Sequence, residues 1–182
     1  DWLSSRGLGD VYKRQEIYSK GSMGNLFYYE DELHAVGMRK RFDWPTNTTV
    51  LKISNTGKVS YKYRSFDRNI VKAEVNEAIL YFLYEDSGKT LLRDGTNNVD
   101  LINSEITIKD FAFNNEQTFV IANSFSNPDE IYELNNGQLT KISKANESFT
   151  KKVKTWDCEY ERIDTGKSEI CLLYTSPSPR DD

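Results

Sequence analysis

A unit of four short strands that recurs about every 40 residues is the feature that most limits what this chain can fold into. The clearest copy spans residues 106–143, where apolar segments alternate with clusters of turn residues. Its expected strands are 106–113, 118–123, 130–134 and 138–142. Loops of hairpin length join them, which predicts one antiparallel sheet. Such a sheet has an apolar face that must pack against another layer.

The same unit recurs upstream. Asn76-Glu77 and Asn115-Glu116 each precede an apolar strand, at an offset of 39 residues. Glycine supplies the positive φ that tight hairpin turns need, so recurring turn glycines mark the same corner of a repeated unit. Three of them are spaced by 38 and 42 residues: Gly57, Gly95 and Gly137.

A period of roughly 40 residues with four antiparallel strands is typical of β-propeller blades, which cover the faces of their neighbours. A β-sandwich or meander whose turns recur by chance is the alternative. The predicted fold class is all-β: a partial β-propeller of about two to three four-stranded antiparallel blades. A short helix at 146–153 and an exit strand at 154–163 should follow the last blade.

The remaining expected strands fall into two groups. The middle blade should use 70–75, 78–84, 89–93 and 99–102, with its second strand apolar on both faces. An earlier blade is expected only in part, with strands at 26–29, 49–54 and 58–63 and a solvated basic strand or loop at 36–44.

Residues 108–142 also resemble the last propeller blade of the prolyl oligopeptidase family of serine peptidases, and in particular its acylaminoacyl-peptidase and dipeptidyl-aminopeptidase branch. The phrases that carry the resemblance are Asp110-Phe111-Ala112-Phe113, Pro128-Asp129-Glu130-Ile131-Tyr132 and Leu139-Thr140, then Asn146-Glu147-Ser148-Phe149 and 156–163. The resemblance covers residues 67–170. It implies that the chain leaves the propeller through 146–163 into an α/β-hydrolase domain that carries the catalytic triad.

The two ends read as translated sequencing adapter. Residues 5–15 back-translate to one strand of a transposase sequencing adapter, and residues 171–181 to its reverse complement in another frame. A genuine flexible head and tail is the alternative. We expect adapter-derived tails at 1–15 and 171–182, which are excluded from fold reasoning. Residues 16–170 are then a partial β-propeller domain that stops at the junction to an absent α/β-hydrolase domain.

Composition excludes several function classes. The net charge is −4 and the isoelectric point about 5.2, so the basic footprint of a nucleic-acid-binding domain is missing. The longest apolar run, 78–84, is far shorter than the roughly 18 residues of a membrane span. With Cys171 in the tail, Cys158 is the one remaining cysteine, and we expect a buried small side chain. No disulfide, zinc site or cofactor is predicted.

No catalytic, cofactor-binding or metal-binding residue is predicted. Ser87-Gly88-Lys89-Thr90 and Gly166-Lys167-Ser168 lack the first glycine of a phosphate-binding loop, so both are expected to be hairpin turns. Serine hydrolysis needs a Gly-x-Ser-x-Gly elbow, which is missing; Gly21-Ser22-Met23-Gly24 follows Lys20 rather than a glycine. The single histidine, His34, is expected to be a surface or partly buried propeller side chain.

The resemblance implies a non-catalytic propeller fragment of a serine peptidase. Its partners would be the hydrolase domain of the same chain and a peptide substrate, whose access the propeller gates. Glu30 and Glu32 could bind a substrate's amino terminus, as paired propeller acids do in the dipeptidyl-peptidase branch; a solvated acidic turn is the alternative. A non-enzymatic propeller that binds protein or glycan is the alternative function. Either fragment should expose blade faces and aggregate.

Overall fold

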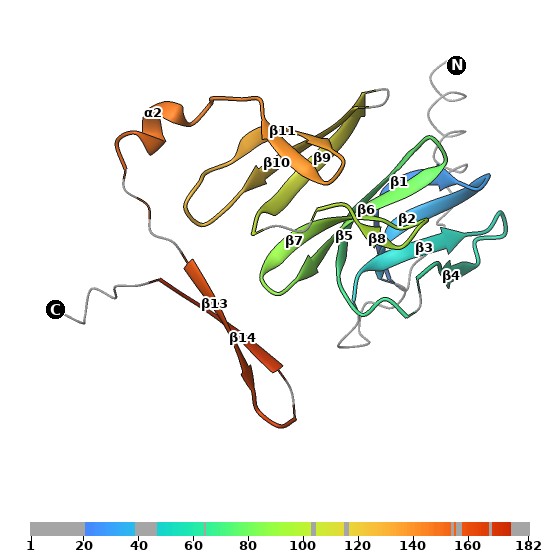
Figure 1. The fold of residues 1–182 in the computed structure, drawn as a ribbon. Coiled ribbons are helices and arrows are strands. Elements are labelled where there is room, and N and C mark those ends of the chain that lie inside the picture. Colours follow the sequence, from blue (N-terminus) through green and yellow to red (C-terminus); the bar gives the residue numbers. More distant parts are fainter. Residues whose placement is uncertain are drawn as a thin grey trace, which may run out of the picture.

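The computed structural model describes residues 21–38, 47–63, 65–102, 105–114, 117–153, 155, 158–167 and 169–175. These residues form three four-stranded antiparallel sheets, one two-stranded hairpin and one short helix. Each four-stranded sheet uses consecutive strands in order, so each is a simple meander (Figure 1). The predicted all-β class, built from four-stranded antiparallel blades, is confirmed.

We call the three sheets blades 1, 2 and 3. Blade 1 contains β1 (Ser22–Tyr29), β2 (Glu32–Met38), β3 (Thr49–Ile53) and β4 (Val59–Tyr61). Blade 2 contains β5 (Ile70–Asn76), β6 (Ile79–Asp86), β7 (Lys89–Asp94) and β8 (Val99–Asp100). Blade 3 contains β9 (Thr107–Asn114), β10 (Gln117–Asn123), β11 (Glu130–Asn135) and β12 (Gln138–Lys141). Helix α2 (Glu147–Thr150) and a hairpin of β13 (Cys158–Asp164) and β14 (Glu169–Thr175) come after the blades.

Blade 1 has all four strands, which corrects the expectation of a partial blade. The sequence predicts an acidic turn through Glu32, whereas β2 already begins at this residue. The turn consists of Glu30 and Asp31 alone, with φ of 52° and 59°. Two-residue hairpin turns with positive φ favour Asn-Gly, Asp-Gly or Gly-Gly. Glu30-Asp31 has no glycine, so the turn was predicted but the hairpin and the start of β2 were not. Of the predicted solvated basic segment 36–44, residues 36–38 form the end of β2, where Val36 is buried rather than solvated, and residues 39–44 lie outside the described residues.

The three recurring glycines lie at one corner of the blade, between its third and fourth strands, as predicted. Gly57 and Gly137 have φ of 75° and 77°, a conformation that glycine adopts without steric cost. Gly95 does not have a positive φ, so a glycine is needed there for a different reason. A Cβ at Gly95 would lie 2.5 Å from Cε1 of Phe82 and 2.6 Å from the hydroxyl of Tyr63. Close packing therefore requires a glycine at this corner of blade 2.

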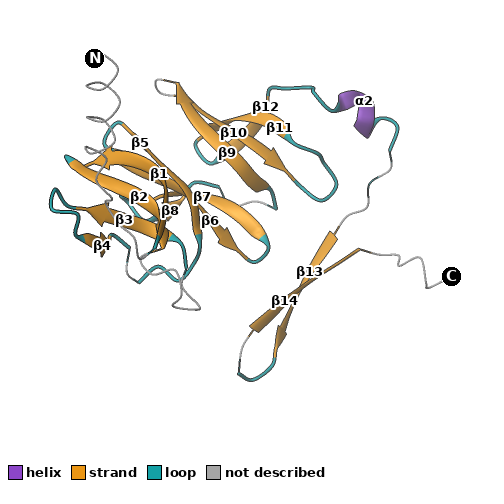
Figure 2. Ribbon diagram, turned by 180° about the vertical axis from the view of Figure 1, so that it is seen from behind, coloured by secondary structure: helices purple, strands orange, loops and turns teal. Residues whose placement is uncertain are grey.

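The blades pack face to face around two apolar cores, which we call seams (Figures 1 and 2). The seam between blades 1 and 2 contains Tyr29, Val36, Val50, Ile70, Ala73, Leu80, Phe82 and Tyr84. The seam between blades 2 and 3 contains Leu83, Leu92, Ile102, Ile108, Phe111, Val120 and Ala122. Strand β6 supplies both, because alternate residues of a strand point to opposite faces. The prediction that this strand is apolar on both faces is confirmed.

The chain leaves blade 3 through α2, which is shorter than the predicted helix at 146–153. Strand β13 overlaps the predicted exit strand, and its hairpin with β14 lies away from the three blades in both views (Figures 1 and 2). Strand β14 was not predicted, and its residues 171–175 belong to the adapter-like tail, so no function is assigned to this hairpin. In the described part of the chain, no helix has the length and apolar character needed to cross a membrane.

Candidate functional site

Both glycine-lysine motifs lie at turns between paired strands. Ser87 and Gly88 make the turn between β6 and β7, and Gly166 lies in the turn between β13 and β14. Both were predicted as hairpin turns, and both predictions are confirmed. Among the described residues, no group of three or more His, Cys, Asp or Glu side chains is placed to hold a metal ion. Cys158 begins β13, but its side chain lies outside the described part of the structure.

Glu30 and Glu32, at the turn between β1 and β2, are both paired with lysines. Glu30 lies 2.6 Å from the Nζ of Lys62, and this hydrogen bond is the largest cause that lowers the pKa of Glu30. Glu32 forms an ion pair with Lys52 of the neighbouring strand. An incoming amino group would have to displace both lysines. Binding of a substrate amino terminus by these acids stays a prediction.

One pattern of three positions repeats on the face that each blade turns toward its successor. Two of the positions are residues i and i+2 of the second strand, and the third is the residue of the third strand that pairs with residue i+2. These pairs are Val36 with Val50, Leu83 with Leu92 and Ile121 with Ile131. The resulting trios are His34, Val36 and Val50 in blade 1, Tyr81, Leu83 and Leu92 in blade 2, and Phe119, Ile121 and Ile131 in blade 3.

Blade 3 presents its trio uncovered. In blades 1 and 2 the next blade buries this face, and Val50 and Leu92 are both 0% exposed. The counterpart in blade 3, Ile131, is 42% exposed, and its neighbour Ile121 is 39% exposed. A shallow groove of about 220 Å³ lies over this face, lined by Asp110, Phe111, Ala112, Phe119, Val120, Ile121 and Ile131. We call this surface the open face, because it repeats the chemistry with which a blade holds its successor.

The open face should make the chain self-associate. We expect the variant Ile121→Lys, Ile131→Lys to elute as a monomer at concentrations where the parent chain aggregates, because charged side chains cannot be buried unpaired. Size-exclusion chromatography with light scattering measures this. The matched control, Leu26→Lys with Val71→Lys, changes two residues that are 61% and 52% exposed outside the open face. If the control variant is also a monomer, the open face is not the cause of self-association.

His34 lies fully buried in the seam between blades 1 and 2, which corrects the expectation of a surface or partly buried side chain. Its ring stacks on Phe27 at 5.7 Å and meets the edge of Tyr29 at 5.8 Å, between ring centroids. Its Nδ1 lies 3.0 Å from the carbonyl oxygen of Glu32, so Nδ1 carries the proton and donates it. Its buried Nε2 has no hydrogen-bond partner among the described residues. Burial lowers the pKa of His34, so the imidazole is neutral.

The buried imidazole should make the chain sensitive to mild acid. Because the pKa of His34 is lower in the folded than in the unfolded chain, the free energy of unfolding should fall as the pH drops below about 6.5. His34→Phe should remove this dependence, since blades 2 and 3 carry Tyr81 and Phe119 at the same position. Urea unfolding at about pH 7.5 and about pH 5.5 measures the difference. If the free energy of unfolding falls equally with pH in both proteins, the pH dependence comes from other titratable groups.

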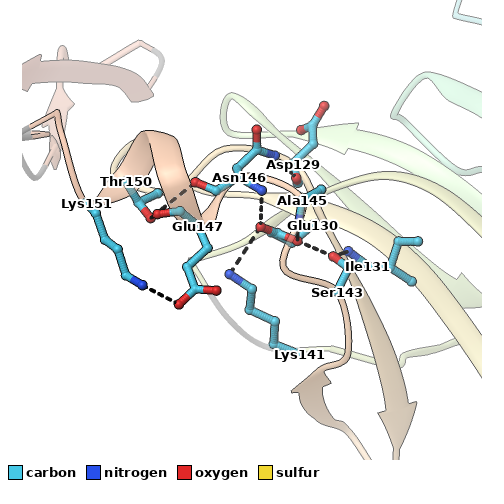
Figure 3. Close-up of polar contacts among 10 residues, drawn as sticks. All are labelled: Asp129, Glu130, Ile131, Lys141, Ser143, Ala145, Asn146, Glu147, Thr150 and Lys151. Carbon is cyan, nitrogen blue, oxygen red and sulfur yellow. Dashed lines mark hydrogen bonds and ion pairs between the residues drawn. The ribbon is translucent and has the colours of Figure 1, made fainter.

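The exit of blade 3 is held by one buried carboxylate, that of Glu130 at the start of β11 (Figure 3). The side chain accepts hydrogen bonds from the hydroxyl of Ser143 and from the backbone N–H groups of Ala145 (3.1 Å) and Asn146 (2.8 Å). The Nζ of Lys141 lies 3.3 Å from it. These donors all come from the end of β12 and the segment after it. They lower the pKa of Glu130 to about 2, the Ser143 hydroxyl most.

Asn146 completes the connection. Its side-chain amide donates to the carbonyl oxygen of Asp129 at 2.6 Å, and its own carbonyl oxygen accepts from Phe149 and Thr150 at 3.0 Å, which starts α2. Sequence analysis identified the phrase around Glu130 and the phrase that begins at Asn146 as two separate parts of the family resemblance. Their contact was missed, because no local pattern reports which donors a strand-end carboxylate will meet.

Three meander blades that share apolar seams define this fold as part of a β-propeller. Solved structures agree. The Pyrococcus horikoshii acylaminoacyl peptidase (orthorhombic crystal form) matches with a TM-score of 0.72 at 17% identity, over 91% of this chain and 27% of that chain. An acylaminoacyl peptidase in complex with Z-Gly-Gly-Phe-chloromethyl ketone matches with a TM-score of 0.70 at 18% identity, over 92% of this chain and 27% of that one.

The β-propeller domain of the Trilobed protease from Pyrococcus furiosus matches with a TM-score of 0.57 at 15% identity, over 74% of this chain and 43% of that chain. No family model and no curated protein sequence matches the chain. The predicted β-propeller, and its likeness to acylaminoacyl peptidases, are thus confirmed at the level of the fold. The chain spans 27% of the length of the acylaminoacyl peptidases it matches.

Proposed function

We propose that residues 16–170 are part of the β-propeller of a prolyl-oligopeptidase-like serine peptidase, and that the propeller gates peptide access to a catalytic domain outside this chain. The observation that carries the proposal is the exit of blade 3. After β12 the chain passes through the network around Glu130 into α2 and then into the hairpin of β13 and β14. This order of elements matches the phrases that resemble the end of a family propeller. The acylaminoacyl peptidases among the structural matches support it.

The role proposed for this segment is steric. Its single histidine is buried between two blades and offers no base to a substrate, and no Gly-x-Ser-x-Gly elbow occurs in the sequence. Rigid blades around a mouth would admit peptides and exclude folded proteins. The serine, histidine and carboxylate of the reaction would lie on the catalytic domain. We also propose that residues 1–15 and 171–182 are adapter-derived.

Recovery of the gene tests the whole proposal. The source DNA is amplified with primers inside residues 106–154 and sequenced far enough past residue 170 to cover a hydrolase domain. We expect Gly-x-Ser-x-Gly, then an aspartate, then a histidine, in the order of an α/β-hydrolase. Both adapter-like ends should be replaced by other sequence. Further repeats of about 40 residues, or an early stop, would contradict the peptidase proposal.

The second candidate function is a non-enzymatic propeller that binds protein or glycan. A polar hollow of about 580 Å³ between blades 2 and 3 favours it, lined by Tyr81, Leu101, Gln117, Thr118, Glu133, Leu134, Asn135, Asn136 and Gly137. Side-chain amides and a carboxylate around an aromatic ring could hydrogen-bond the hydroxyl groups of a glycan. The same gene recovery separates the candidates, because only the peptidase needs a hydrolase domain.

A further inference from the structure

We propose that Glu130 is a positioning residue that sets the direction in which the chain leaves the propeller, by holding the backbone of residues 143–146. The inference rests on the proposed function in one respect only, namely that a catalytic domain lies beyond the exit and that its placement depends on this segment. The contact itself lies within the described residues.

Apolar packing does not hold this segment in place. No residue of α2 is buried, and Phe149 and Val153 are 48% and 42% exposed. Ile142, the last residue before the segment, is 51% exposed. Because α2 has no buried apolar residue, hydrogen bonds and ion pairs are the main contacts that fix the position of the exit.

Glu130 supplies the central hydrogen bonds, and both of its carboxylate oxygens are used. Oε2 accepts from the hydroxyl of Ser143 and the N–H of Ala145, while Oε1 accepts from the N–H of Asn146 and lies near the Nζ of Lys141. Every one of these partners is a donor. A carboxylate satisfies all of them, whereas the NH₂ of a glutamine would face at least one backbone N–H, which cannot accept, whichever way its amide is turned.

The network also ties the exit to the strand that carries Glu130. Ser143 Oγ, which donates to Glu130, accepts from the N–H of Ile131 at 2.8 Å. Further along, the hydroxyl of Thr155 donates to the carbonyl oxygen of Ser126 at 2.8 Å, in the loop between β10 and β11. The chain therefore runs along the end of blade 3 and is held there at more than one point. Figure 3 shows how the donors of residues 141–146 converge on Glu130.

Backbone amide exchange measures how firmly Glu130 holds this segment, whatever follows the segment in the chain. The parent chain is compared with Glu130→Gln, with the milder Ser143→Ala and with the matched control Glu133→Gln. Glu133 lies on the same strand, where it accepts one bond from Gln117 at 3.1 Å. We expect exchange of the amides of residues 145–151 to accelerate on the order of tenfold or more in Glu130→Gln, and less in Ser143→Ala. Exchange at Val120, in the seam, should stay unchanged.

Two results would overturn the inference. One is exchange at residues 145–151 that is the same in Glu130→Gln as in Glu133→Gln. The other is acceleration that reaches Val120 equally, which would make the network a support of blade 3 as a whole. If Glu130→Gln does not fold, Ser143→Ala provides the same comparison. The outcome is separate from the peptidase proposal, because exchange reports on this chain whatever the recovered gene encodes after residue 170.

Discussion

Phe82→Ala is expected to lower the free energy of unfolding by about 3–5 kcal/mol, the range for truncation of a buried phenylalanine. Phe82 is 1% exposed in the seam between blades 1 and 2. Its ring centroid lies 5.3 Å from that of Tyr63, 5.4 Å from that of Phe66 and 6.2 Å from that of Tyr84. Truncation would leave a cavity among rings that are held by several elements and cannot all move inward.

Urea unfolding of the Ile121→Lys, Ile131→Lys protein, with and without Phe82→Ala, measures this effect free of self-association. Phe149→Ala is the control, because Phe149 is 48% exposed and its truncation should cost less than about 1 kcal/mol. Equal losses in the two variants would mean that the seam between blades 1 and 2 contributes little to stability.

Gly95→Ala should cost about 1–3 kcal/mol, the range for overpacking of a core. The added Cβ would meet Phe82 and the Tyr63 hydroxyl, and this hydroxyl is bonded to the carbonyl oxygen of Gly95 itself at 2.9 Å. Gly24→Ala is the matched control, because no described atom lies within 4 Å of a Cβ at that position. Unfolding by urea in the same lysine background gives both values.

A double variant tests the cause of this effect. In the Phe82→Ala background the ring that obstructs the new methyl group is gone, so Gly95→Ala should cost clearly less than it does alone. The same cost in both backgrounds would place the strain elsewhere, at the Tyr63 hydroxyl or in the turn itself.

The sequence predicted those parts of the fold that depend on a period. The recurring turn glycines and the apolar strands of blades 2 and 3 predicted the meander, its corners and the burial of β6 on both faces. Where a turn lacks glycine, as at Glu30 and Asp31, the hairpin signal fails, and β2 was predicted only through the possible strand or loop at 36–44. Gly95 was placed at the correct corner for the wrong physical reason, because contacts with Phe82 are invisible in a local pattern.

The candidate site was harder to predict than the fold. The burial of His34 could have been found by aligning the blades, because Tyr81 and Phe119 occupy its position. The contact between Glu130 and Asn146 could not, since it depends on the path of a loop. The open face of blade 3 emerges only when exposure is compared at equivalent positions.

The two faces of β6 also determine where a propeller of this kind can change length. Phe82 and Leu83 are neighbours in the chain but serve different seams, so the insertion of one residue within this strand would exchange the contents of the two cores. Turns carry no such penalty. The connection between the third and fourth strands is 54–58 in blade 1, 95–98 in blade 2 and 136–137 in blade 3. The corners of such repeats can therefore differ in length where packing leaves room, while the strands must keep their register.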